Sequence, residues 1–166
     1  TIDALDTLTH YTVNYLGVSV EYDNEGGIWY AQYRGTPKES EPTLIHVNAQ
    51  GVEDYKDFTF VSRSSAIRFN KDFSLLAIAG NGGKKCTIFK VEKDAEGKPV
   101  LNKQYEFAVN GNNVNDMAWD YANNLYIVNS SSELLYMYAM PRESAVVTTP
   151  AAERYSVKMP MPMEIE

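Results

Sequence analysis

The sequence has a single cysteine, no long apolar segment and little clustered positive charge, and each shortage excludes a class of protein. Cys86 has no second cysteine to pair with, so an internal disulfide framework is excluded. No stretch approaches the roughly 18 apolar residues that a membrane-spanning helix needs. The longest basic run is the pair Lys84-Lys85, and the formal net charge is −7. A surface that follows nucleic-acid phosphates is therefore excluded, because it would need clustered Lys and Arg.

Sequence signatures of catalysis are also missing. The chain has no nucleophile elbow, phosphate loop or dinucleotide fingerprint. His10 and His46 both fall within strand patterns, and neither lies at metal-ligand spacing from another His, Cys or carboxylate. The segment Gly80-Asn81-Gly82-Gly83 is rich in glycine, but no helix follows it to bind a phosphate. We therefore predict no catalytic residue and no metal ligand.

What the sequence does contain is a threefold repeat. The whole sequence is 44% hydrophobic and 12% aromatic, which is the composition of a folded globular chain. One sequence motif recurs: an apolar residue, any residue, an aromatic residue, Asp or Asn, a four-residue spacer and an apolar run. The copies begin Val20-Glu21-Tyr22-Asp23, Ile67-Arg68-Phe69-Asn70 and Met117-Ala118-Trp119-Asp120. They lie 47 and 50 residues apart, in the range of four-stranded propeller blades.

Each copy continues as a predicted four-stranded antiparallel meander, rich in aromatic and β-branched residues. We expect second strands at 28–33, 75–79 and 125–128, third strands at 43–47, 87–91 and 134–138, and fourth strands at 55–61, 105–109 and 155–159. Asp23, Asn70 and Asp120 each begin a five-residue reversal. A turn-forming role is favoured for them over metal binding, because such side chains bond the backbone two residues on.

The predicted fold class is all-β: a β-propeller segment of three four-stranded antiparallel blades and one extra outer strand. The blades cover 18–61, 65–109 and 114–159 of a single domain, 1–166, and residues 10–15 resemble the fourth strand of a preceding blade. The tail, 160–166, alternates Met with Pro and cannot be helical. It is expected to be either a linker or a strand that starts another blade.

Three blades do not close a ring, since propellers have four to eight. Open blade faces carrying Val20, Tyr22, Trp29 and Phe69 would be too apolar to stay in water. We expect either further blades from a longer polypeptide or a second copy that completes a ring of about six. A fragment of a longer protein that self-associates when isolated is favoured.

The repeat resembles the β-propeller superfamily, and more narrowly its NHL and YVTN or lactonase-type blades. Asp23, Gly26-Gly27 and Ile28-Trp29-Tyr30 match an NHL-like blade best. In style the chain also resembles propeller portions of secreted or surface proteins of Gram-negative gut bacteria. The resemblance implies an extracytoplasmic location, and a chain that starts at Thr1 without an initiator Met is compatible with secretion or with excision from a longer chain.

Ligand-binding candidates lie in the loops that ring one mouth of such a propeller, which are rich in amides and hydroxyls. The candidates are Arg63, Asn112, Asn113, Asn115 and Asp116. An alternative is that these loops only turn the chain. Glu21 and Arg68 occupy equivalent points of neighbouring first strands, where they either hold a polar ligand or form a structural ion pair.

The predicted function is a non-catalytic recognition or scaffolding module, outside the cytoplasm, with a protein or carbohydrate ligand and no nucleic acid. One alternative is a lactonase-type hydrolase, and another is a purely structural domain. The lactonase resemblance implies calcium held by acidic residues of several blades, for which only Glu21 and Asp116 are candidates here. No cofactor is therefore predicted, and calcium remains the alternative if other blades supply ligands.

Overall fold

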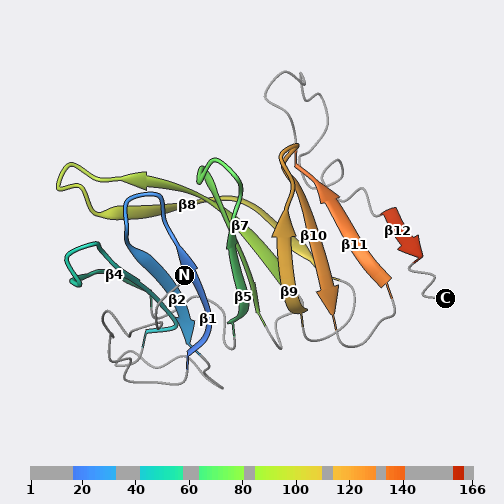
Figure 1. Ribbon diagram of the computed structural model, residues 1–166, viewed down its shortest axis with the longest axis horizontal. Coiled ribbons are helices and arrows are strands. Elements are labelled where there is room, and N and C mark those ends of the chain that lie inside the picture. The colour runs from blue at the N-terminus through green and yellow to red at the C-terminus, as the bar shows by residue number, and fades with distance from the viewer. Residues whose placement is uncertain are drawn as a thin grey trace, which may run out of the picture.

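In a computed structural model of the protein, the described residues form strands and turns (Figure 1). The structure describes residues 17–32, 42–57, 64–80, 85–109, 114–129, 134–140 and 159–162. They form three four-stranded antiparallel sheets, each with its strands in sequence order. The first contains β1 (Gly17–Tyr22), β2 (Ile28–Gln32), β3 (Leu44–Val47) and β4 (Glu53–Asp57). The second contains β5 (Ser64–Phe69), β6 (Leu75–Gly80), β7 (Lys85–Lys93) and β8 (Pro99–Ala108), and the third β9 (Val114–Trp119), β10 (Asn124–Asn129), β11 (Leu134–Ala139) and β12 (Met159–Pro162). The predicted all-β blades are confirmed.

The turns between the first and second strands are built in the same way in all three sheets. Asp23, Asn70 and Asp120 each accept backbone hydrogen bonds through Oδ1, which confirms their turn-forming role. The donors are the amides of Glu25 and Gly27 (2.8 Å each), of Leu75 (2.9 Å), and of Ala122 and Asn124 (2.8 and 2.9 Å). The third residue after each head has a positive φ: 87° at Gly26, 61° at Phe73 and 60° at Asn123.

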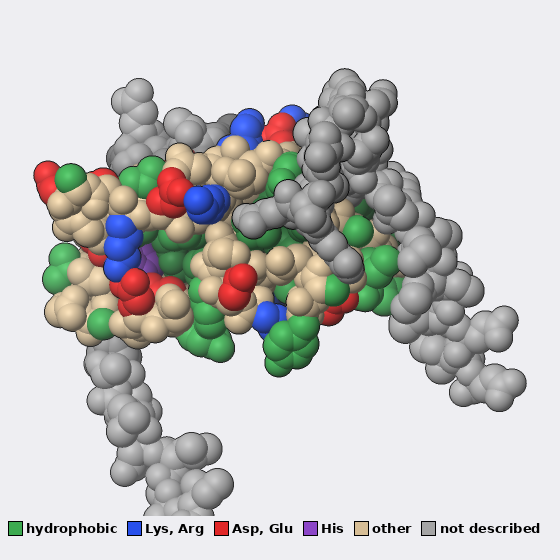
Figure 2. All heavy atoms as spheres, turned by 90° about the horizontal axis from the view of Figure 1, so that it is seen from above, with side chains coloured by type: hydrophobic (Ala, Val, Ile, Leu, Met, Phe, Trp, Pro, Cys, Tyr) green, Lys and Arg blue, Asp and Glu red, His purple; other side chains and the backbone are tan. Residues whose placement is uncertain are grey.

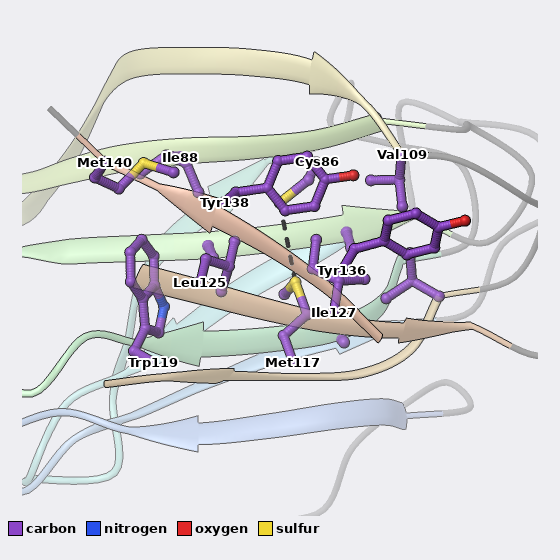
Figure 3. Close-up of a cluster of buried hydrophobic side chains, with 14 residues drawn as sticks. Cys86, Ile88, Val109, Met117, Trp119, Leu125, Ile127, Tyr136, Tyr138 and Met140 are labelled. Atoms are coloured by element: carbon purple, nitrogen blue, oxygen red, sulfur yellow. Dashed lines mark hydrogen bonds between the residues drawn. The ribbon is translucent and has the colours of Figure 1, made fainter. Parts of the chain in front are cut away.

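The sheets pack face to face, with their first strands β1, β5 and β9 next to one another. Figure 1 shows the three sheets side by side. Between the first and second sheets lies a core that includes Trp29, Leu44 and Phe69. Figure 3 shows the core between the second and third sheets, where Cys86 points toward Met117 and Trp119 lies near Leu125. Adjacent inner strands and apolar sheet interfaces are the arrangement of propeller blades.

The aromatic residue of the repeated motif packs against the preceding sheet. Phe69 and Trp119 are 9% and 4% exposed, and Trp119 Nε1 donates a hydrogen bond to the Arg68 carbonyl oxygen at 3.1 Å. Tyr22, the equivalent residue of the first sheet, is 63% exposed. The exposure of Tyr22 is explained by position, since no described sheet precedes the first one.

Two of the four residues expected on open blade faces are instead buried. Val20 and Tyr22 are exposed as predicted, but Trp29 is 1% exposed and Phe69 is 9% exposed. Trp29 pairs with Glu21 in the register of β1 and β2, so it lies on the opposite face of the sheet from Val20 and Tyr22. That face packs against the second sheet, which is why Trp29 and Phe69 lie in the same core.

The third sheet differs from the prediction at its fourth strand. The strand was expected at 155–159, of which 155–158 lie outside the described residues. The described segment that pairs with β11 is β12, with Pro160 opposite Tyr136 and Pro162 opposite Leu134. Part of the predicted tail is therefore a strand of the third sheet. Two prolines spaced by two residues place both missing N–H groups on one side of the strand, and an edge strand tolerates that. The predicted outer strand at 10–15 lies outside the described residues.

Cys86 packs as a small hydrophobic residue. Its side chain is fully buried, with Sγ 3.9 Å from Met117 Sδ, and burial raises the pKa of the thiol. Because only the thiolate attacks a disulfide reagent, we expect no reaction of the native protein with Ellman's reagent and complete reaction in urea. Fast labelling of the native protein would contradict this packing.

Within the described ranges, no helix is long and apolar enough to span a membrane.

Candidate functional site

Four of the seven predicted ligand-binding residues are among the described ones. Glu21 lies on β1, Arg68 on β5, and Asn115 and Asp116 on β9. Arg63, Asn112 and Asn113 lie outside the described residues. The structure brings Glu21 and Arg68 into one cleft of about 340 Å³, which Ala118, the equivalent residue of the third sheet, also lines. We call this the inner-strand cleft.

The ion pair in this region has a different partner from the predicted one. Arg68 Nη2 lies 2.7 Å from Asp116 Oδ1, so the pair joins β5 to β9 and not β1 to β5. Glu21 instead accepts backbone hydrogen bonds, from the Tyr22 amide at 3.1 Å and from the Phe69 amide at 3.3 Å. The predicted Glu21–Arg68 pair is therefore wrong, because the Glu21 carboxylate is engaged by the backbone at the interface of the first two sheets.

A larger cleft, of about 520 Å³, lies between the first and second sheets and was missed by sequence analysis. Its walls are the β1–β2 turn, the β3–β4 turn and the β7–β8 hairpin. Among its lining residues are Asp23, Glu25, His46, Ala49, Glu92 and Lys93. We call it the rim cleft.

The long β7–β8 hairpin creates one wall of the rim cleft. Strands β7 and β8 have nine and ten residues, whereas every other described strand has four to six. The extra length carries the hairpin past its own sheet and over β4 (Figure 1). Val91 and Leu101, on the projecting part, pack against the core between the first two sheets. Lys93 then pairs with Glu25 of the β1–β2 turn, so the hairpin and the first sheet are joined across the cleft.

His46 lies in the wall of the rim cleft between two carboxylates. Its Nε2 is 2.7 Å from Asp23 Oδ2 and its Nδ1 is 2.5 Å from Asp54 Oδ1, and the residue is 6% exposed. Both ring nitrogens of His46 are therefore engaged by carboxylate oxygens. The ring also packs on Trp29, with ring centroids 4.7 Å apart. Figure 2 shows acidic and basic side chains around a histidine on this face of the molecule.

A β-bulge aims Asp54 at His46. In the register of β3 and β4, His46 lies opposite Tyr55 and Val47 opposite Glu53, which leaves Asp54 as the additional residue. The positions equivalent to His46 hold Ile88 in the second sheet and Met137 in the third, since these pair with Ala77 and Tyr126, the residues equivalent to Trp29. A histidine in place of an apolar strand residue, with aspartates in the neighbouring turn and strand, is the sequence signal that could have located this cluster.

The cluster has a structural role, since both ring nitrogens of His46 are engaged by aspartates and its ring packs on Trp29. In the part of the chain that the structure describes, no group of three or more His, Cys, Asp or Glu side chains is arranged to hold a metal ion.

Hydrogen bonds stabilise the ionised form of Asp23. Burial alone would raise the pKa of this carboxyl group, but the bonds from His46 and from the amides of Glu25 and Gly27 outweigh burial and hold the pKa below its ordinary value. A pKa that is lower in the folded state stabilises the fold above the unfolded value of about 4. The contribution is lost as the pH falls through the lower folded value.

We therefore expect Asp23→Asn to destabilise the protein at neutral pH and to have a progressively smaller effect below about pH 4. The measurement is the free energy of unfolding in urea for both proteins, from about pH 7 to about pH 3. A difference between the two proteins that stays constant over this range would contradict the role of the ionised carboxylate.

Comparison with known proteins gives a fold and no family. No family model matches the chain, and no match was found among curated proteins. Among solved structures, the chain is similar to the β-propeller domain of Cps50 (Swd1) from Myceliophteria thermophila, with 12% sequence identity and a TM-score of 0.63. The match covers 90% of this chain and 44% of that one, so the chain spans less than half the length of its structural neighbour. Together with the three stacked four-stranded sheets, this likeness shows that the chain is a segment of a β-propeller.

Proposed function

We propose that this chain is a non-catalytic recognition segment that binds a protein partner through the rim cleft. The observation that carries the proposal is the extended β7–β8 hairpin, which builds a cleft of about 520 Å³ against the first sheet. This volume is within the range of about 300–1,000 Å³ typical of ligand sites. The turns that form the walls stand on rigid blades, an arrangement suited to recognition.

The character of the cleft favours a peptide over a sugar. Sugars stack on exposed aromatic faces, but Trp29 and Phe69, which line the cleft, are only 1% and 9% exposed. Its rim instead carries exposed charged side chains from two different sheets, including Glu25 and Lys93. Such groups suit hydrogen bonding to a peptide segment of a partner protein.

A matched pair of alanine substitutions tests the site. Ala49 lines the rim cleft, whereas Ala122 is an equally small exposed residue in the β9–β10 turn of the third sheet. Peptides selected from a random displayed library against the whole chain should bind Ala49→Arg at least about tenfold more weakly. Their affinity for Ala122→Arg should stay within about twofold of the wild-type value.

Other outcomes would replace this proposal. Peptides that ignore Ala49→Arg but are lost with Asn115→Arg would place the ligand at the predicted mouth, which includes Asn115 and Asp116. Binding on a glycan array with no selectable peptide would favour a carbohydrate ligand. A rise in melting temperature with calcium that EDTA reverses would favour the lactonase-type alternative, because a ligand that binds only the native state stabilises it.

The proposal also concerns the blade type, the cellular location and the closure of the propeller ring. The NHL-like blade type and the extracytoplasmic location stay predictions from resemblance, and a signal peptide in the full reading frame would test the location. For ring closure we propose either further blades or a second copy as the partner.

A further inference from the structure

The turn between β5 and β6 holds an aromatic residue in a backbone conformation that aromatic residues rarely adopt. Phe73 has a φ of 61°, in the left-handed region. The equivalent turns of the first and third sheets place Gly26 and Asn123 at this point, and both residue types tolerate the conformation. The turn itself therefore does not require an aromatic side chain. Backbone strain of this kind gathers at functional sites, so the side chain of Phe73 needs another reason.

The ring of Phe73 lies between the two clefts. Phe69 and Phe73 line both the rim cleft and the inner-strand cleft, so the two clefts share a wall. The ring centroid of Phe73 is 5.5 Å from that of Phe69 and 5.4 Å from that of Tyr22. Phe73 is only partly buried. Part of its ring is therefore open to a ligand that crosses from one cleft to the other.

On the rim-cleft side of Phe73, carboxylates are in excess. The carboxylates that line this cleft are those of Asp23, Glu25, Asp54 and Glu92. Their ion-pair partners among the described residues are His46, Lys90 and Lys93. Even with a protonated histidine, four negative groups face three positive ones. A basic residue of a ligand is therefore favoured on this side.

On the other side of Phe73, the inner-strand cleft offers an exposed cation. The Glu21 carboxylate accepts hydrogen bonds from two backbone amides, and Arg68 pairs with Asp116. Lys71, which also lines this cleft, is exposed, and its Nζ lies 5.7 Å from the centre of the Tyr121 ring. Among the described residues, no carboxylate forms an ion pair with Lys71. An acidic residue of a ligand is therefore favoured on this side.

We propose that the two clefts form one groove for an extended peptide that crosses over Phe73. The peptide carries a basic residue in the rim cleft, an apolar residue on the Phe73 ring and an acidic residue at Lys71. An apolar centre with polar groups around it is the usual plan of a protein interface. The opposite charges at the two ends fix the direction in which the peptide lies. This inference rests on the proposed function, because it names the chemistry of the peptide that the rim cleft binds.

The substitution Phe73→Asn tests the centre of the groove. Asn is the residue of the third sheet at this point, so the turn can form without the aromatic ring. Library peptides that lose affinity with Ala49→Arg should bind Phe73→Asn at least about tenfold more weakly. Protection of Cys86 from Ellman's reagent shows that the variant is folded, because this side chain is fully buried in the native protein.

A charge exchange tests the acidic end of the peptide. Lys71→Glu should weaken the same peptides at least about fivefold. Lys103→Glu makes the same change in net charge at a side chain that is 59% exposed and lines neither cleft, and it should alter affinity by less than about twofold. A peptide in which Lys replaces the acidic residue should bind poorly to the wild type and recover with Lys71→Glu. Recovery shows a direct contact, which a structural effect of the substitution would not give.

The outcomes separate this inference from the proposed function. Peptides that lose affinity with Ala49→Arg but bind Phe73→Asn and Lys71→Glu like the wild type would overturn the single groove and leave the rim cleft as the site. A library that gives no peptide sensitive to Ala49→Arg would overturn both. A lower urea midpoint in Phe73→Asn with unchanged peptide affinity would assign the Phe73 ring to the core alone and would also overturn the groove.

Discussion

Replacing Trp119 by alanine is expected to lower the free energy of unfolding by about 3–5 kcal/mol. Trp119 is 4% exposed at the interface of the second and third sheets, so the substitution leaves a large cavity there. It also removes the hydrogen bond from Nε1 to the Arg68 carbonyl oxygen. The loss is a large part of the roughly 5–15 kcal/mol that stabilises a typical domain. Urea unfolding followed by circular dichroism measures it.

Tyr121→Ala provides the control for Trp119→Ala. Tyr121 is an aromatic residue only two positions away, but it is 91% exposed in the adjacent turn. Its ring lies 5.7 Å from Lys71 Nζ, a cation–π contact worth about 0.5–1 kcal/mol at an exposed site. We expect Tyr121→Ala to lower the stability by no more than this amount. Similar losses for the two variants would show that Trp119 does not hold the sheets together.

The substitution Gly27→Ala is expected to lower the free energy of unfolding by about 2–3 kcal/mol. A Cβ atom at Gly27 would lie 2.6 Å from both Asp23 Oδ2 and His46 Nε2 and 2.9 Å from the Val47 carbonyl oxygen. No atom pair of this kind tolerates such a distance, so either the turn or the hydrogen bond between Asp23 and His46 must move. The wall of the rim cleft would then change shape.

Gly51→Ala separates steric crowding from backbone strain. Gly51 has a φ of +78° and nothing within 4 Å of the added atom, so its substitution introduces strain without a clash. It should lower stability by about 1 kcal/mol. In Gly27→Ala the nuclear magnetic resonance signals of the His46 ring should shift, whereas in Gly51→Ala they should not. Unchanged His46 signals in Gly27→Ala would contradict the close contact.

The blades could be predicted because their determinants are local. The repeated motif that ends in Asp23, Asn70 or Asp120 contains both the alternating apolar residues of a strand and the residue that forms the following turn. Three copies at similar spacing then imply that each sheet packs on the next. Phe69 was placed on an open face, but it is buried like Trp119, which stands at the equivalent position of its sheet.

The rim cleft could not be predicted because it depends on contacts between sheets. Nothing near Lys93 in the sequence indicates that it meets Glu25, 68 positions away. The role of His46 also depends on a bulge at Asp54, which a strand pattern does not reveal. The strand β12 was missed for a different reason. Pro160 and Pro162 argue against a strand in the middle of a sheet but not at its edge.

The fluorescence of the two tryptophans tests the packed blades most directly, because each reports one sheet interface. Trp29 lies between the first and second sheets and Trp119 between the second and third, at 1% and 4% exposure. In Trp119→Phe and Trp29→Phe, the remaining tryptophan should emit at short wavelength, resist quenching by acrylamide and become exposed in one urea transition that coincides with the loss of circular dichroism. A tryptophan that is quenched freely in the native protein, or that becomes exposed well before the strands unfold, would show that its sheets are not packed as blades.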